Sequence, residues 1–510
     1  METAHSVCRT VYLVAPRNPD SFWCMASSVK AVGARALMPN SALATLLALT
    51  PPDLGIDFRF CDENISGLDP DMKCDLVALT GFTLHAPRIA EISALFRRRG
   101  IPVALGGAFA TLSPAQAAPM ADYLFLGEAE LTWPRFLREW VAGNAAPLYE
   151  QKEHVDMSLS PPPDWRFVRG KDYLYFTVQA SRGCPNKCDF CNAVQLVGRR
   201  YRHKSVAQVV QEVENARLMG AETVFFSEDN FFVNRAFTRE LLVSLVRWNT
   251  ALARPVSFSC QASVTIGADE EIVKLMADAR FSVVFLGVES LSADCLTEVN
   301  KGHLARYDAR TTVTTLSRYG IIPFIGFIVG FDHDTPETFV ELERFLDETA
   351  SPIASISVLN APEDTPLFRR MKDNGRIAEE FAGIWHFSTN IVPTAMPLKD
   401  LLERHRTLFR SLYEPDRFER RTLAWLDGVQ YRSPLYVNAR TNWSKMLKAV
   451  HIFRFYMRHP DKSVRTMFFR VLRKTWKADP RRLKKAITIL SQFPHYYSFS
   501  HDAVWYEAGK

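Results

Sequence analysis

Three cysteines stand close together in the stretch SRGCPNKCDFCNA, residues 181–193. Cys184, Cys188 and Cys191 follow a Cys-x3-Cys-x2-Cys spacing, which lets one short loop wrap a single metal centre. Zinc would need a fourth ligand, which His203 could supply, but structural zinc sites usually pair two cysteine knuckles and the sequence offers no second one. A 4Fe-4S cluster held by three thiolates would keep one iron open for a substrate or cofactor. The spacing favours the cluster over zinc.

The elements that must position this loop fall into three parts. Residues 1–150 alternate short apolar runs with helical stretches, which indicates a parallel sheet covered on both faces, so we predict a doubly wound (Rossmann-like) α/β domain. Three consecutive prolines in SLSPPPDW cannot continue a helix or a central strand, and residues 151–171 are predicted to be a linker.

Residues 172–365 repeat strand and helix candidates six times, which predicts a partial (β/α)6 barrel. The strand candidates are YLYFTVQA, TVFFSED, VSFSCQASV, SVVFLGVES, IPFIGFIVGF and ASISVLNA. The cysteines come directly after the first of them, where a parallel barrel builds its active site. Residues 366–510 are predicted to be helical.

Composition limits the classes of protein to which the chain can belong. With 510 residues, 47% of them hydrophobic, it is long enough for several globular domains. The N-terminus lacks the zones of a signal peptide, and the apolar run IIPFIGFIVGF is too short to cross a bilayer. Nine cysteines, scattered outside the loop, favour reduced thiols over a disulfide framework. We therefore expect a cytoplasmic protein.

The positive charge is concentrated near the end of the chain. Residues 431–490 contain 16 Lys and Arg against two acids, a net charge of +14 in a chain whose formal net charge is +6. Pro460 and Pro480 divide this region into helical pieces. In the second piece the apolar residues share one helix face; they are Val464, Met467, Phe468, Val471 and Leu472. Such a region suits a solvated surface, a nucleic acid or an anionic membrane.

The loop CPNKCDFC, with Phe190 before its last cysteine, resembles the signature of radical S-adenosylmethionine (SAM) enzymes. This resemblance implies that SAM binds the open iron of a 4Fe-4S cluster and is cleaved by an electron to a 5′-deoxyadenosyl radical. The segments DLVALTGF, ALGGAFATLSP and FLGEAELTWPRF resemble, in order, the cobalamin-binding domain of one large branch of these enzymes. Segments of the barrel and the helical tail resemble a group within that branch that includes hopanoid methylases.

The resemblance implies three sets of site residues, and no catalytic residue is assigned. The cluster ligands are Cys184, Cys188 and Cys191. The SAM-binding residues are Phe190, Glu228, Asp229, Asn230, Gln261 and Glu289. The cobalamin-binding residues are Thr80, Gly106, Gly107, Gly127 and Glu128. Helix capping remains an alternative for residues 228–230, and salt bridges or hydrogen bonds within the barrel remain alternatives for Gln261 and Glu289.

Two departures from the family pattern stand out. The loop after the first strand, PRNPDSFW, lacks the histidine that binds cobalt in some cobalamin domains, and His85 is expected to be a surface-loop residue. Glu363 and Asp364 stand where a Pro-Gly pair is expected. Arg182 and Lys187 are interpreted as solvated charges.

The leading hypothesis is a cobalamin-dependent radical SAM methyltransferase acting on an unactivated carbon of an apolar, hopanoid-like lipid. The alternative on the same scaffold is a radical SAM cyclase or rearrangement enzyme. Transfer-RNA methylthiolation fits less well, because the tail is helical and the N-terminal cysteines are not clustered. A non-enzymatic zinc and nucleic-acid binding module is a further alternative. Expected partners are a small-molecule or lipid substrate and a reductant such as flavodoxin or ferredoxin. Residues 440–490 are expected to contact the anionic inner membrane face peripherally, and no nucleic acid is expected.

Overall fold

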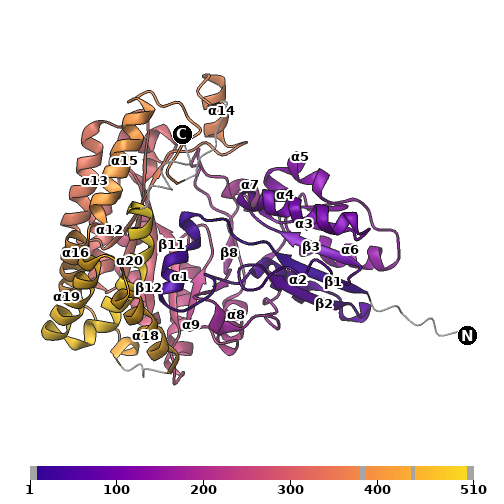
Figure 1. The fold of residues 1–510 in the computed structure, drawn as a ribbon, viewed down its shortest axis with the longest axis horizontal. Helices are drawn as coiled ribbons and strands as arrows, with labels where there is room; N and C mark the ends of the chain where they lie inside the picture. Colours follow the sequence, from indigo (N-terminus) through magenta and orange to yellow (C-terminus); the bar gives the residue numbers. More distant parts are fainter. Residues whose placement is uncertain (1–8, 379–385, 438–442, 502–510) are drawn as a thin grey trace, which may run out of the picture. The chain divides into compact units, whose positions relative to one another are not determined.

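The computed structural model describes residues 9–378, 386–437 and 443–501. Its contacts divide the chain into two compact units (Figure 1). Unit 1 comprises residues 1–24, 35–184 and 193–221, and unit 2 comprises residues 25–34, 185–192 and 222–510. The division crosses the cysteine loop after Cys184. The domain boundaries proposed from the sequence remain predictions.

Unit 1 is built on a parallel sheet with the strand order β2-β1-β3-β4-β5-β6. Its strands are β1 (Thr10–Ala15), β2 (Asp57–Asp62), β3 (Leu76–Thr80), β4 (Val103–Gly106), β5 (Tyr123–Leu126) and β6 (Leu148–Glu150). The first five match the apolar runs in the sequence. The short edge strand β6 was not predicted, because only one of its three side chains is buried.

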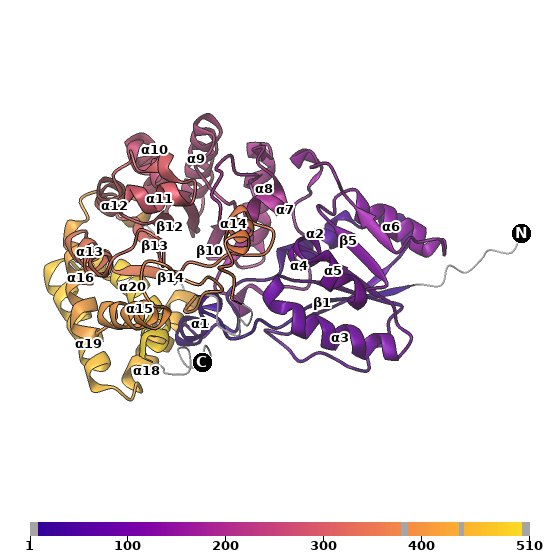
Figure 2. The same cartoon turned by 90° about the horizontal axis from the view of Figure 1, so that it is seen from above.

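Helices cover both faces of this sheet (Figure 2). On one face, α2 (Ser41–Leu49) and α6 (Thr132–Val141) pack over strand residues such as Leu13 and Phe125. On the other face, α3 (Ala86–Arg98) and α4 (Ala108–Leu112) pack over residues such as Val14 and Leu105. Each strand buries side chains on both sides, which explains the continuous apolar runs. The doubly wound arrangement predicted for the N-terminal part is confirmed.

The remaining elements of unit 1 are short, apart from one long helix. They are η1 (Phe22–Cys24), η2 (Pro52–Leu54), η3 (Thr83–His85), α5 (Pro114–Ala117), η4 (Ala118–Met120), η5 (Met157–Leu159), η6 (Gly170–Asp172), β7 (Phe176–Val178), β8 (Ser181–Arg182), α7 (Ala193–Val197), β9 (Arg202–His203) and α8 (Val206–Leu218).

Unit 2 contains five neighbouring parallel strands in the order β14-β13-β12-β11-β10. They are β10 (Thr223–Phe226), β11 (Ser257–Ser263), β12 (Phe281–Glu289), β13 (Ile322–Val329) and β14 (Ile353–Val358). With β7, all six strands predicted for the barrel are present. The helices between them are α9 (Arg235–Thr250), α10 (Glu270–Ala279), α11 (Ala293–Glu298), α12 (Ala309–Arg318) and α13 (Pro336–Glu348), with short turns η7 (Val264–Ala268) and η8 (Gly302–Leu304).

The C-terminal part of unit 2 is helical, as predicted. It consists of α14 (Pro366–Asp373), α15 (Leu398–Leu412), α16 (Pro415–Gly428), α17 (Pro434–Val437), α18 (Trp443–Met457), α19 (Lys462–Ala478), η9 (Pro480–Arg482) and α20 (Leu483–His501), and the short α1 (Ala26–Ala31) packs on α20. The predicted face of α19 is buried at Val464, Met467, Phe468 and Val471, against α16 and α20. Among the described helices, none is both long and apolar enough to cross a bilayer.

The turn after β14 contains the acidic pair Glu363-Asp364. Asp364 has a φ of +63°, the left-handed region that glycine favours. Thr365 follows and caps α14 by accepting a hydrogen bond from the Phe368 N–H. An aspartate therefore occupies the conformation that the family's glycine is expected to adopt, and asparagine and aspartate tolerate it better than most residues.

Candidate active site

The second and third cysteines form one tight turn in unit 2. The Cys191 N–H donates to the Cys188 carbonyl at 3.2 Å, and both side chains are half-buried. Asp189 anchors the turn from both sides, because its N–H donates to the Val299 carbonyl and its own carbonyl accepts from the Leu367 N–H, both at 3.0 Å. Its carboxylate also pairs with Arg370 at 3.0 Å.

Phe190 fixes the same turn through apolar packing. It lies against a buried cluster whose members all come after the ends of β12, β13 or β14. The cluster consists of Cys295, Val299, Phe331, Leu359, Ala361, Leu367, Met371 and Ile391. The turn is thereby held at the C-terminal ends of the strands, where parallel α/β barrels carry out their chemistry.

Cys184 belongs to unit 1, where its N–H donates to the Gly198 carbonyl at 3.2 Å. Gly183 before it has a φ of +94°, and a Cβ there would stand 2.2 Å from the Arg200 carbonyl oxygen. Only glycine fits at this position. Among the described residues, no three His, Cys, Asp or Glu side chains are arranged to hold a metal ion. The shared cluster remains a prediction from the spacing.

Three of the predicted SAM residues meet where β10 and β11 end. The Gln261 side chain donates to the Glu228 carbonyl at 2.8 Å, and the Phe231 N–H donates to the Gln261 carbonyl at 2.9 Å. The Asn230 side-chain oxygen accepts from the Phe232 N–H at 3.1 Å and from the Ser263 N–H at 3.3 Å. Asn230 therefore holds its turn together and ties it to β11, whereas the residue that caps α9 is Asn234, which accepts from the Phe237 N–H at 3.2 Å.

Two acids of this turn differ in exposure, Glu228 being buried and Asp229 partly buried. Glu228 is 3% exposed, and its charge adds to burial in raising the pKa of the Cys260 thiol. Burial also raises the pKa of Asp229, and within the described part of the chain the one hydrogen bond that opposes this shift comes from its own backbone. A buried carboxyl of this kind favours a cationic or hydrogen-bond-donating ligand.

Glu289 ends β12 in a strained conformation. Its φ is +65°, and the register with β13 shifts between Gly287 and Glu289. The carboxylate pairs with Lys301 at 2.5 Å, and the Lys301 ammonium also donates to the Gly287 carbonyl at 3.0 Å. The salt-bridge alternative is thus the arrangement in the structure. Strain of this kind costs about 1–3 kcal/mol and gathers at functional sites.

Four of the predicted cobalamin residues lie at strand ends in unit 1. Thr80 ends β3 and Gly106 ends β4, side by side in the sheet. Gly107 has a φ of +86°, and a Cβ there would stand 2.2 Å from the Thr80 hydroxyl oxygen. Gly127 follows β5 with a φ of +83°, and its Cβ would stand 2.6 Å from the Gln151 carbonyl oxygen. Both Gly107 and Gly127 are required by the backbone itself.

Glu128 is occupied by two arginines. Its carboxylate pairs with Arg182 at 3.0 Å and with Arg202 at 2.8 Å, and it accepts from the Val155 N–H at 2.7 Å. Burial alone would raise the pKa of Glu128, but Arg202 and Arg182 outweigh it and lower that pKa below its usual value. The interpretation of Arg182 as a solvated charge was wrong, because it also pairs with Glu130.

His85 is not a surface residue, contrary to expectation. It is 6% exposed and both ring nitrogens are used, Nδ1 by the Phe82 N–H and Nε2 by the Asn18 side chain, each at 2.9 Å. Burial lowers its pKa, so the ring is neutral at pH 7. It closes the loop after β3 onto the loop after β1.

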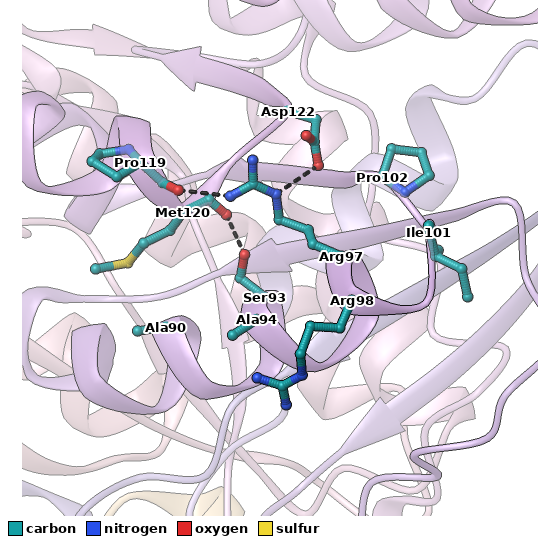
Figure 3. A pocket seen from close by; sticks show the side chains of 11 residues that line it. Ala90, Ser93, Ala94, Arg97, Arg98, Ile101, Pro102, Pro119, Met120 and Asp122 are labelled. Carbon is teal, nitrogen blue, oxygen red and sulfur yellow. Dashed lines mark hydrogen bonds and ion pairs between the residues drawn. The ribbon is translucent and has the colours of Figure 1, made fainter.

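A cavity of about 580 Å³ in unit 1 lies at the other end of the sheet (Figure 3). It is lined by α3 and by the segments that precede β4 and β5. Figure 3 shows its polar groups bonded to one another: Arg97 to Pro119 and Asp122, and Ser93 to the Met120 carbonyl. None of the predicted cobalamin residues lines it.

Comparison with known proteins places this geometry in a family. Residues 178–346 match the radical SAM superfamily, and residues 365–506 match a domain of unknown function, DUF4070. The chain is 30% identical to an uncharacterized methyltransferase of Synechocystis sp., over 79% of this chain and 76% of the relative. It is also 30% identical to the hopanoid C-2 methylase of Rhodopseudomonas palustris, over 73% of this chain and 72% of the relative. The chain belongs to the radical SAM superfamily.

The fold of this radical SAM protein also has a solved counterpart. The radical SAM methyltransferase TsrM of Kitasatospora setae, solved with cobalamin and a [4Fe-4S] cluster bound, has a TM-score of 0.62 at 15% identity. The match covers 87% of this chain and 99% of that one. The predicted fold class, an α/β domain followed by a radical SAM barrel and a helical extension, is confirmed.

The donor set in this radical SAM protein suits an iron-sulfur cluster. Three thiolates are soft ligands of the type that hold such clusters. Two of them share a turn that is fixed by backbone bonds at Asp189. The assignment of the polar residues after β10 and within β11 to SAM binding remains a prediction.

Sequence reasoning missed the side chains that support the site. Lys301, Arg202 and Arg370 each neutralise a carboxylate of the predicted site or of the cysteine turn. Glu289 and Lys301 are 12 residues apart, Asp189 and Arg370 are 181 apart, and no local pattern joins them. An acidic residue at the end of a buried strand predicts a cationic partner, but the sequence does not indicate which residue that partner is.

Replacing Glu128 by Gln should destabilise unit 1 by about 3–5 kcal/mol, because two arginines lose their buried counter-charge. The wild-type folded pKa lies below the unfolded one, so this stability is present above the unfolded pKa and is lost as the pH falls through the folded pKa. Chemical denaturation from pH 3 to 8 measures both effects. The exposed Glu153→Gln variant is the control. Equal stability of the two variants at pH 7 would contradict this role.

Proposed function

We propose that this protein is a cobalamin-dependent radical SAM methyltransferase that methylates an unactivated carbon of an apolar, hopanoid-like lipid. The observation that carries the proposal is the cysteine turn anchored by Asp189 and Phe190 at the C-terminal strand ends. The 30% identity to a hopanoid C-2 methylase over most of both chains supports the substrate class.

Cys184, Cys188 and Cys191 would hold the 4Fe-4S cluster, and Glu228, Asp229, Asn230 and Gln261 would receive SAM. When bound, the cluster and SAM supply a 5′-deoxyadenosyl radical, and cobalamin supplies the methyl group. The residues of this chain orient and shield these groups. Asp229, whose carboxyl is buried, would accept a hydrogen bond from a cationic amino group. Glu289, already paired with Lys301, would shape the wall of the site.

For cobalamin, the glycine-lined ends of β4 and β5 offer backbone that a large ligand can approach closely. Thr80 stands beside Gly107 and would contribute a hydroxyl there. Glu128 would act through its arginines, because its carboxylate is already occupied. His85 is held by two hydrogen bonds, so it would support the loop and leave cobalt without a histidine from this position.

An apolar substrate calls for access to a membrane, and α18 provides a suitable surface. Its buried side contains Ile452 and Tyr456. Along its other side, five large apolar side chains are each about half exposed, and four of them recur at i, i+4, i+7 and i+11; they are Met446, Leu447, Val450, Phe453 and Met457. Exposed Arg454 and Arg458 lie among them. A helix with an apolar face and basic neighbours is suited to bind the cytoplasmic surface of an anionic membrane.

Replacing Cys188 by Ser should remove iron and sulfide from anaerobically reconstituted protein and reduce 5′-deoxyadenosine formation to background, because a cluster ligand is lost. Iron analysis and chromatography of SAM cleavage products measure this. Cys74→Ser, a half-buried thiol outside the loop, should leave both values unchanged. Full iron content in Cys188→Ser would refute the assigned ligand.

Incubation with SAM carrying a deuterated methyl group, cobalamin, a flavodoxin or ferredoxin reductant and a hopanoid should yield a product heavier by one labelled methyl group. Mass spectrometry detects this label. A product without it, formed together with 5′-deoxyadenosine, would instead show the cyclase or rearrangement alternative.

Introducing acids on α18, in Leu447→Glu with Val450→Glu, should weaken binding to vesicles that contain anionic lipid by about 10-fold, since apolar contact is lost and charge repulsion is added. Co-sedimentation measures the bound fraction. Val340→Glu with Leu218→Glu places the same charges at other exposed apolar positions and should bind like wild type. Equal binding by all three proteins would exclude α18 as the contact surface.

A further inference from the structure

A small basic pocket lies at the opposite end of the barrel strands from the cysteine turn. It has a volume of about 190 Å³ and is lined by five cationic side chains together with Gly320 and Phe281, which stand just before β13 and at the start of β12. The cationic residues are Arg432, Arg481, Arg482, Lys484 and Lys485. Because these segments precede the strands, the pocket is separate from the site at the strands' C-terminal ends.

The arginines of this pocket already share one carboxylate. Asp479 accepts from Arg481 at 2.9 Å, lies 3.6 Å from Arg482 and pairs with Arg432. Arg482 also pairs with Asp427 at 2.8 Å. Three guanidinium groups are thereby held by two carboxylates, Asp479 and Asp427. The arginines therefore leave a net positive charge at the pocket wall.

Two lysines and a buried arginine add further positive charge. Lys485 donates to the Gly320 carbonyl and lies 5.8 Å from the Trp425 ring. Arg280 is 5% exposed and donates to the Leu435 carbonyl at 2.8 Å and to the Ser257 hydroxyl at 3.3 Å. Burial and then the charge of Arg280 lower the pKa of Lys485 to about 7, and the same two causes lower the pKa of Lys484.

Gathering these cations in one place is electrostatically unfavourable. Cations from separate parts of the chain are held near one another here; Lys485 and Arg482 are partly out of water, whereas Lys484 and Arg481 are exposed. A bound dianion would offset both the repulsion and the desolvation. Guanidinium and ammonium groups converging on a small cavity are the donors that phosphate prefers.

We propose that this pocket binds a phosphate group, carried either by a free phosphorylated compound or by a lipid headgroup. The site goes beyond the proposed methyl transfer and does not depend on it. The same pocket is also lined by Tyr319, Tyr431 and Val429. We expect these side chains to contact the group to which the phosphate is attached.

The double variant Lys484→Gln with Lys485→Met tests this site, because methionine preserves the apolar stem of Lys485. Titration calorimetry with inorganic phosphate and with glycerol 3-phosphate should show one site per chain in wild type and at least 10-fold weaker binding in the variant. The control, Lys462→Gln with Lys477→Gln, removes two exposed lysines of α19 that do not line the pocket and should bind like wild type.

Vesicles distinguish the two sources of phosphate. If the ligand is a lipid headgroup, the double variant should bind phosphatidylcholine vesicles containing phosphatidic acid more weakly than the control does. If the ligand is a free compound, both proteins should bind these vesicles equally and only the calorimetric signal should fall.

The proposal is overturned if the wild-type protein binds neither inorganic phosphate nor glycerol 3-phosphate and its vesicle binding does not depend on Lys484 and Lys485. It is also overturned if the double variant and the control lose affinity equally. Lys484→Gln alone, at an exposed position, should weaken binding in the same direction and guards against a folding defect in the double variant. These assays need no iron, SAM or methyl transfer, so their failure and the failure of the proposed function are distinguishable.

Discussion

The fixed position of Asp189 is the constraint on which the rest of the proposed chemistry depends. Cysteines in a surface loop would sample many arrangements, at a cost of about 1–2 kcal/mol for each residue that a ligand must order. Here the backbone of Asp189 is bonded to the segments after β12 and β14, its carboxylate is held by Arg370, and Phe190 is packed beside it. The conformational entropy of the turn with Cys188 and Cys191 is therefore already lost when unit 2 folds, and packing and hydrogen bonds in unit 2 compensate for it. A metal centre bound there would inherit a defined position relative to the strand ends.

Carboxylates of the predicted site are likewise held in place by partners from other parts of the chain. Glu289 and Glu128 are each neutralised by cations from later in the chain, and Asn230 ties the turn after β10 to β11. These contacts are all made within the chain itself. Asp229 differs, since burial raises its pKa, and it is the acid in this group best suited to meet a ligand.

Much of this architecture could be predicted from the sequence, because its signals are local. Continuous apolar strands indicated a two-sided parallel sheet, and prolines marked the breaks between α18, α19 and α20. The cysteine spacing and Phe190 located the turn. What could not be predicted depends on pairs far apart in the chain. His85 was expected on the surface because it lies in a loop after a strand, yet hydrogen bonds with Asn18 and Phe82 hold it inside. Arg182 was predicted to be a solvated charge, because its partners Glu128 and Glu130 are more than 50 residues away in the sequence.

The two ends of the barrel strands differ in chemistry, with thiols and acids at one and a concentration of cations at the other. The proposed chemistry requires SAM to bind, at the first of these ends, an iron that no side chain coordinates. Electron-nuclear double resonance of the reduced protein with SAM labelled by ¹⁷O in its carboxylate and ¹⁵N in its amino group measures this directly. Hyperfine coupling of both labels to the cluster is the predicted result. A cluster signal without either coupling, or a site filled by zinc with a fourth protein ligand, would contradict it.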